Sequence, residues 1–200
     1  MPPTHSAPRR PREILRSRTQ SLHQATEMQI GWGQIFASRA NYLRFLGAML
    51  RINLPAEIAI DRQIGATSPT WFDSRRTSAW LYDDLRQLSE AGFAQPPASD
   101  LADFDFVDSP ATAAGVVYVL EGSALGGAIL AKTLQQKLQI TAENGGKYLH
   151  GYGKGAGAHW GEVTAWLDAT LTDEASIDLA VDAAAKTFSI FGSQLNEFRP

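Results

Sequence analysis

The chain contains no cysteine. This absence excludes disulfide bonds, a thiolate nucleophile, cysteine-ligated zinc, iron–sulfur clusters and thiolate-ligated haem. Any bound metal must therefore use histidine, carboxylate, tyrosine or methionine ligands. Histidine is also scarce, because the sequence has only His5, His23, His150 and His159.

Long hydrophobic runs are missing too. No run of eighteen consecutive apolar residues is present, so we expect no membrane-spanning segment. The first eleven residues hold no apolar stretch that would serve as a signal peptide, and we expect a cytoplasmic protein. The net charge of −3 gives no general attraction to nucleic acid or to an anionic membrane surface.

The alternating patterns typical of β-strands are lacking as well, and apolar residues instead recur at helical spacing. We therefore predict an all-α fold, a single-domain helical bundle of about seven or eight helices. The proline-rich residues 1–11 are expected to form a disordered arm, and residues 12–200 the helical domain.

Helix boundaries follow from capping residues, prolines and glycines. Residues 141–157 contain six glycines and are predicted to be a loop. Pro55 is expected to kink or interrupt the second helix, which resumes through Ile64. The predicted helices cover residues 11–28, about 38–64, 78–89, 109–138, 158–171 and 174–198.

One short stretch of the first helix carries candidate metal chemistry. Thr19, His23 and Glu27 are spaced four residues apart and share one helix face. Arg16 returns to within roughly 20° of that face, about 10 Å along the axis. An imidazole that borders an apolar stripe, with Glu27 to accept its other N–H, fits an axial metal ligand. A half-buried surface histidine that pairs with Glu27 fits the same pattern.

The predicted helix over residues 109–138 contains an unusual concentration of glycine. Gly122, Gly126 and Gly127 each cost roughly 1 kcal/mol relative to alanine inside a helix. Glycine allows close contact between two helices, and it also leaves room for a flat apolar ligand against the backbone. Gly115, Gly122, Ser123 and Gly126 lie on about one side of the helix, so a groove would run along that side.

Taken together, these two stretches resemble the haem oxygenases. The proximal helix of that family carries Thr-x-x-x-His-x-x-x-Glu, which residues 19–27 match, and its distal helix is kinked by glycines, which residues 122–127 match. The segment Tyr118–Gly127 is most similar to the bacterial haem oxygenases associated with bacteriophytochromes. Similar residues continue through 42–46, 55–57, 151–153, Trp160 and 187–188.

The resemblance implies a haem oxygenase-like helical domain that holds haem between its first helix and its glycine-kinked helix. Haem would be both cofactor and substrate, together with O2 and electrons from an external donor, a ferredoxin or a reductase. The implied products are biliverdin, carbon monoxide and ferrous iron, with a bacteriophytochrome as the acceptor of biliverdin.

The resemblance also assigns roles to individual residues. Many family members have an aspartate on the distal helix where this chain has Ser123, which leaves open a non-catalytic haem- or bilin-binding protein. The implied roles are an iron ligand (His23), residues behind it (Glu27 and Thr19), a distal catalytic wall (Gly122, Ser123, Gly126 and Gly127), propionate partners (Arg16 and Lys186, with Lys154 and Lys147 as substitutes) and pocket residues (Tyr118 and Phe188).

Two other classes of helical enzyme fit the sequence less well. A di-iron bundle needs several carboxylates with paired Glu-x-x-His motifs, and this chain has only the reversed His159-x-x-Glu162. Thiaminase-like enzymes share a compatible helix pattern, but their nucleophilic cysteine is absent here.

Overall fold

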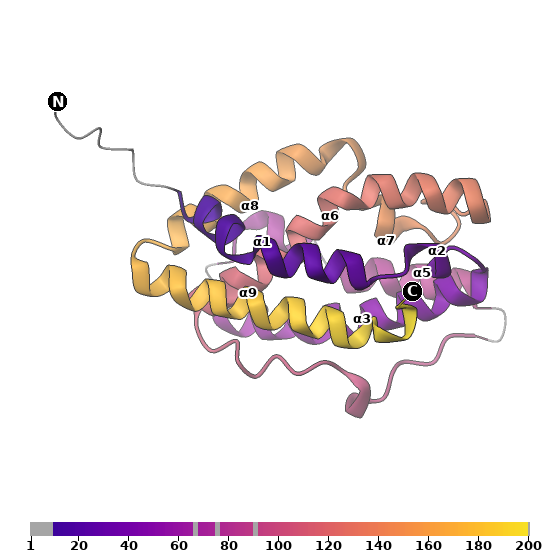
Figure 1. Cartoon of the computed structure of the whole chain (residues 1–200), viewed down its shortest axis with the longest axis horizontal. Helices are drawn as coiled ribbons and strands as arrows, with labels where there is room; N and C mark the ends of the chain where they lie inside the picture. Colours follow the sequence, from indigo (N-terminus) through magenta and orange to yellow (C-terminus); the bar gives the residue numbers. More distant parts are fainter. Residues whose placement is uncertain (1–9, 66–67, 75–76, 90–91, 200) are drawn as a thin grey trace.

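A computed structural model describes residues 10–65, 68–74, 77–89 and 92–199, and these residues form helices and no strand. The helices pack as a bundle in which α1 crosses in front of α6 and α9 runs beside α1 (Figure 1). The α-helices are α1 (Pro11–Gln29), α2 (Trp32–Ile35), α3 (Arg39–Ile64), α4 (Thr70–Ser74), α5 (Thr77–Leu88), α6 (Pro110–Leu138), α7 (Lys147–His150), α8 (Ala156–Thr170) and α9 (Glu174–Gln194). Single 3-10 turns are η2 (Ala98–Asp100), η3 (Gly153–Gly155) and η4 (Asn196–Phe198).

The predicted all-α fold is confirmed, and most helix boundaries agree to within two residues. Seven of the described α-helices have five or more residues, and α2 and α7 are single turns. Local caps explain the agreement: the Ser109 hydroxyl accepts the backbone N–H of Thr112, and the Asp173 carboxylate accepts that of Ser176. The last helix is shorter than predicted, since α9 ends at Gln194 and only the turn η4 follows.

The start of the helical domain differs slightly from the prediction. Arg10 is the N-cap of α1, and its backbone N–H bonds to the carboxylate of Glu13. Pro11 is the first helical residue, a position that proline tolerates because no hydrogen bond is needed there. Residues 1–9 of the expected arm lie outside the described residues, so that part of the domain division stays a prediction.

Pro55 does not interrupt the second helix, because α3 is continuous from Arg39 to Ile64. Proline lacks the N–H that would bond to the carbonyl four residues earlier. That carbonyl belongs to Arg51, and it accepts the backbone N–H of Ala102 at 2.9 Å. A distant segment therefore satisfies the group that proline leaves free, which a local reading cannot foresee.

The prediction of a loop over residues 141–157 is wrong in its middle, where α7 and η3 form. Asp84 of α5 explains α7: its buried carboxylate accepts the backbone N–H groups of Lys147 at 3.0 Å and Tyr148 at 2.8 Å. The carboxylate thus caps the helix from another part of the chain. Burial raises the pKa of Asp84, and the two N–H groups partly offset this effect.

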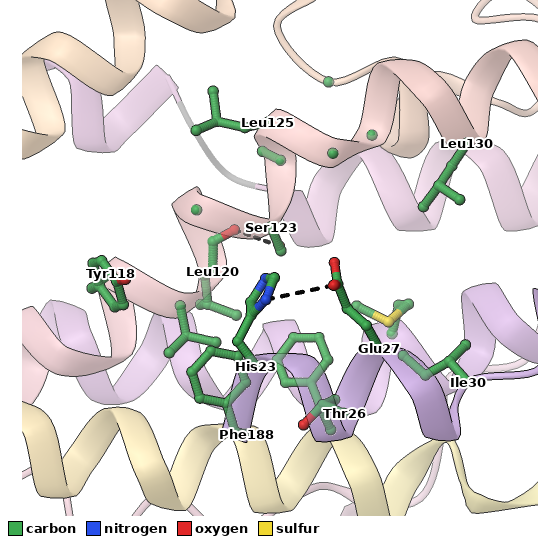
Figure 2. A pocket seen from close by; sticks show the side chains of 18 of the residues that line it. His23, Thr26, Glu27, Ile30, Tyr118, Leu120, Ser123, Leu125, Leu130 and Phe188 are labelled. Atoms are coloured by element: carbon green, nitrogen blue, oxygen red, sulfur yellow. Dashed lines mark hydrogen bonds and ion pairs between the residues drawn. The ribbon is translucent and has the colours of Figure 1, made fainter. Parts of the chain in front are cut away.

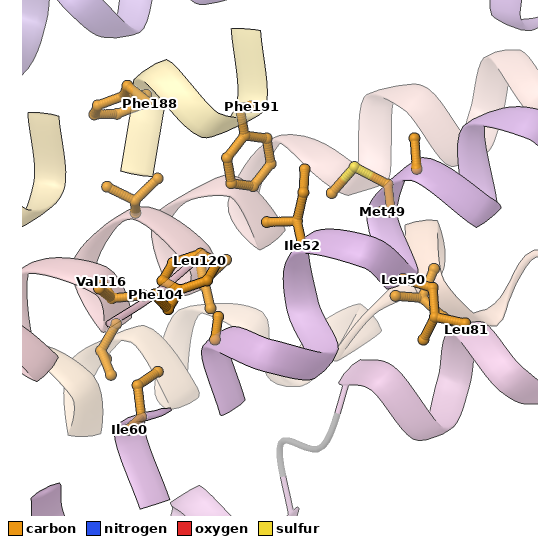
Figure 3. Packing of buried hydrophobic residues seen from close by; sticks show 14 of the residues in the cluster. Met49, Leu50, Ile52, Ile60, Leu81, Phe104, Val116, Leu120, Phe188 and Phe191 are labelled. Carbon is orange, nitrogen blue, oxygen red and sulfur yellow. The ribbon is translucent and has the colours of Figure 1, made fainter. Parts of the chain in front are cut away.

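The hydrophobic core lies where α6 packs against α3, α8 and α9. Figure 3 shows side chains from α3, α6 and α9 converging, among them Ile60, Val116 and Phe191. The approach of α6 to α9 is close: a Cβ atom on Gly115 would lie 2.1 Å from the carbonyl oxygen of Ala180. Gly115 therefore serves helix packing, and it does not belong to a ligand groove as its position had indicated.

Helix α6 is long and apolar enough to cross a membrane by length and composition alone, which differs from the expectation drawn from consecutive apolar residues. Half of its most apolar window is buried inside the structure. A helix that packs on several neighbours needs an apolar surface on more than one side. The packing of α6 in the core therefore accounts for its composition.

Replacement of Gly115 by alanine tests this close packing. The added methyl group must displace the backbone of α9, and we expect a loss of about 1–3 kcal/mol in the free energy of unfolding despite the higher helix propensity of alanine. Gly47→Ala is the matched control, since its Cβ would meet only the end of the Arg51 side chain at 3.8 Å. That variant should gain roughly 0.5–1 kcal/mol. Equal stability of the two variants in urea unfolding would contradict the packing account.

Candidate functional site

Helices α1 and α6 face each other across a cavity of about 1020 Å³, at the upper end of the size range of small-molecule and cofactor sites. The cavity brings together residues about 100 positions apart in the sequence. Of the residues predicted for the site, those that line it are Arg16, Thr19, His23, Glu27, Tyr118, Gly122, Ser123, Gly126, Gly127 and Phe188.

His23 stands on the α1 side of this cavity, and its imidazole points toward α6 (Figure 2). The His23 side chain is 51% exposed, so its ring is accessible from the cavity. Its Nδ1 atom lies 3.6 Å from Oε2 of Glu27, which is longer than a direct hydrogen bond. The ring of Phe188 meets the imidazole edge to face at 5.7 Å. Since Nδ1 faces Glu27, Nε2 is the nitrogen available to a metal.

The glycines of α6 differ in what surrounds them. A Cβ on Gly127 would lie 2.5 Å from the carbonyl oxygen of Leu149, so helix packing requires this glycine. A Cβ on Gly126 would meet nothing within 4 Å, and one on Gly122 would meet only the Trp160 ring at 3.7 Å. Protein packing therefore does not explain Gly122 and Gly126. They leave bare backbone against the cavity, as a flat ligand requires.

Ser123 also lies on the α6 side of the cavity, above His23 in Figure 2. Its hydroxyl donates to the carbonyl of Leu120 at 2.7 Å. The helix is continuous through this region, but it rises away from α1 after Ser123 (Figure 2). The hydroxyl oxygen can still accept hydrogen bonds from a ligand or a water molecule.

A polar group of residues gathers at one end of the cavity. Thr19 is buried, and its hydroxyl donates to the Leu15 carbonyl at 2.8 Å within its own helix. Burial raises the pKa of Tyr118, while the Thr19 hydrogen bond and the positive charge of Arg16 oppose the rise. The phenol therefore stays protonated at neutral pH and can donate a hydrogen bond. Thr19 and Tyr118 thus both line the cavity, and the role of Thr19 behind His23 stays a prediction.

The structure does not bring the predicted lysines to the cavity. The Nζ atom of Lys186 lies over the ring of Phe106, 5.1 Å from its centroid, and Lys186, Lys154 and Lys147 are not among the lining residues. Arg12, which was not among the predicted site residues, does line the cavity, and its Nη1 atom lies 3.5 Å from the Thr164 hydroxyl. Arg12 precedes Arg16 by four residues, a spacing that could have identified the pair.

Sequence reasoning also missed a buried polar cluster behind α6. Glu121 is the single charged residue in the stretch 111–131, and its carboxylate contacts Tyr152 and His159. A charged residue in such an apolar stretch needs a polar partner, so the isolated Glu121 was the feature of the sequence that could have indicated this cluster. Its two partners could not be identified from the sequence, because they lie 31 and 38 residues further along the chain.

The arrangement fits haem as a ligand. A half-exposed imidazole faces bare glycine backbone across a cavity of adequate volume, and two arginines stand at one end where carboxylates would be bound. His23 would hold the iron, and Gly122 and Gly126 would face the opposite side of the ring.

Comparison with known proteins agrees with this arrangement. A family model described as Heme oxygenase matches residues 12–197. Heme oxygenase PigA of Pseudomonas aeruginosa is 29% identical over 195 residues, which cover 94% of this chain and 96% of that protein. The NO- and CO-bound heme oxygenase of Neisseria meningitidis has a similar fold, with a TM-score of 0.80 at 24% identity over 94% of this chain and 92% of that chain. For heme oxygenase from Leptospira interrogans the TM-score is 0.78 at 18% identity over 94% and 100%.

The two solved structures share the fold, and the family model spans nearly the whole described chain. The resemblance seen in the sequence is therefore confirmed, and this chain belongs to the haem oxygenase family of enzymes.

Proposed function

We propose that this protein opens the haem ring to biliverdin, with release of carbon monoxide and ferrous iron. Haem is cofactor and substrate in this reaction, O2 is the oxidant, and a ferredoxin or a reductase supplies electrons in the cytoplasm. The observation that carries the proposal is the cavity between α1 and α6, where His23 faces Gly122 and Gly126. A bacteriophytochrome is the proposed acceptor of biliverdin, on the resemblance of residues 118–127.

On the proximal side, His23 binds the iron through Nε2. Glu27 lies on the Nδ1 side at 3.6 Å and accepts the second ring N–H directly after a small rotation, or through a water molecule. Phe188 packs edge to face on the same imidazole and restricts its rotation. These two neighbours orient the ring that holds the iron.

On the distal side, the backbone at Gly122 and Gly126 would face the bound haem, since neither residue carries a side chain into the cavity. When bound, haem supplies both the iron at which dioxygen is reduced and the ring that is opened. Ser123 orders water near the distal face, because its oxygen accepts hydrogen bonds while its proton is donated to Leu120. Arg16 and Arg12 bind the propionates at the polar end of the cavity.

Haem turnover by the purified protein tests the proposed reaction. Protein mixed with haemin and a reductant in air should lose the Soret absorption band while the biliverdin spectrum grows. A haem spectrum that stays stable under these conditions would instead identify a non-catalytic haem- or bilin-binding protein, the alternative that Ser123 leaves open.

Histidine variants identify the iron ligand within the same experiment. His23→Ala should abolish both the histidine-ligated spectrum and turnover. His150→Ala is the matched control, since His150 is exposed on α7 and does not line the cavity. An unchanged spectrum for His23→Ala would assign the iron to another ligand.

Adding a side chain at Gly126 tests whether haem binds against this part of α6. Gly126→Leu places a side chain in open space, so the ligand-free protein should fold with equal or greater stability, whereas haem affinity should fall on the order of tenfold or more (about 1.4 kcal/mol). The matched control is Gly161→Leu, at an exposed glycine of α8 outside the cavity with no neighbour within 4 Å. Haem titration followed at the Soret band measures both affinities, and equal affinities would exclude Gly126 from the haem-binding surface.

Removal of one arginine tests the polar end of the cavity. Arg16→Ala should weaken haem binding by about 1 kcal/mol, roughly fivefold, because an exposed charge-assisted hydrogen bond to a carboxylate contributes on this order. Arg18→Ala is the control: Arg18 lies two residues further on the same helix but pairs with Asp178 of α9. A loss equal to that of Arg16→Ala in this control would point to overall charge, and no loss in either variant would remove the propionate role.

A further inference from the structure

Glu121 is held by two hydrogen bonds directly before the glycines of α6. Its side chain is 1% exposed. Its Oε2 atom accepts from the Tyr152 hydroxyl at 3.1 Å and from Nε2 of His159 at 2.7 Å. A buried carboxylate with two donors is costly to displace, because a shift that breaks either hydrogen bond leaves a buried charge less well compensated.

The two donors are themselves held rigidly. The Tyr152 ring stacks on the His159 imidazole with centroids 3.7 Å apart, and the Trp71 ring meets that imidazole edge to face. Gly151 and Gly153, with φ of 51° and 53°, flank Tyr152 and permit the sharp turn that presents its hydroxyl to α6.

The other end of the glycine stretch is attached to the same part of the chain. A Cβ on Gly127 would lie 2.5 Å from the Leu149 carbonyl oxygen, so the two backbones are in direct contact. Residues 122–126 thus run between two attachments, and both come from the segment 149–159. Within that stretch, a Cβ on Gly126 would meet nothing in the described protein within 4 Å.

We propose that Glu121, Tyr152 and His159 form a clamp that positions the distal glycine backbone over haem and thereby determines which biliverdin isomer is produced. The inference rests on the proposed function. None of these three side chains lines the cavity, so they are positioning residues that act through the backbone of Gly122. A shift of that backbone changes the space above each edge of the ring, and so which meso carbon is open to attack.

Two variants separate positioning from simple stability. His159→Phe keeps a ring for stacking but removes the donor to Glu121, whereas His159→Gln keeps a donor. With haem, a reductant and carbon monoxide, we expect His159→Phe to shift and broaden the C–O stretching band, and His159→Gln to restore it toward the wild-type position. In turnover, His159→Phe should yield a second biliverdin isomer. Glu162→Gln, on the exposed face of the same helix, is the control and should change neither measurement.

Tyr152→Phe provides a second test should His159→Phe not fold, since it removes one hydroxyl and keeps the stacked ring; we expect a smaller shift in the same direction. A wild-type C–O band and a single isomer in every variant that binds haem would overturn the clamp. The carbon monoxide measurement needs haem binding but no ring opening. Failure of turnover in the wild-type protein would therefore overturn the proposed function, whereas the C–O band of the variants would still test whether the clamp positions the backbone.

Discussion

The close approach of the α6 backbone to its surroundings is the constraint on which the structure depends. At Gly115 the helix touches the backbone of α9, and at Gly127 it touches the backbone before Gly151. Between these contacts the same helix leaves Gly126 facing open space, and a Cβ on Gly122 would be in ordinary contact with the Trp160 ring at 3.7 Å. The glycines of α6 therefore have two roles: Gly115 and Gly127 allow the backbone contacts that hold the helix in place, whereas Gly122 and Gly126 leave the cavity open between them.

These two roles explain why α6 contains glycines, although glycine has a low helix propensity. Each glycine costs stability relative to alanine, yet the costs at Gly115 and Gly127 are offset by packing that no larger residue permits. At Gly122 and Gly126, no close backbone packing in the described protein offsets this loss of stability. Stability given up at a position without a packing reason is typical of a functional site.

Local signals carried much of the fold and part of the site. The caps Ser109 and Asp173 act within four residues, and the helical face of His23 and Glu27 follows from spacing alone, so these features could be predicted. The cap that Asp84 gives to α7 spans more than sixty residues, and no pattern in the sequence announces it. For the same reason Lys186 was assigned to the site although its amine lies over Phe106.

The hydrogen bond between the Arg51 carbonyl and the Ala102 amide has a consequence for the long connection between α5 and α6. Pro55 leaves this acceptor free in the interior of α3, so the connection must return to one fixed point of that helix. Of the residues between α5 and that point, the described ones at 92–101 form only the turn η2 and are mostly exposed. The connection can therefore vary in length on its α5 side, whereas its passage at Ala102 is tied to the proline, and the two positions are expected to change together among related chains.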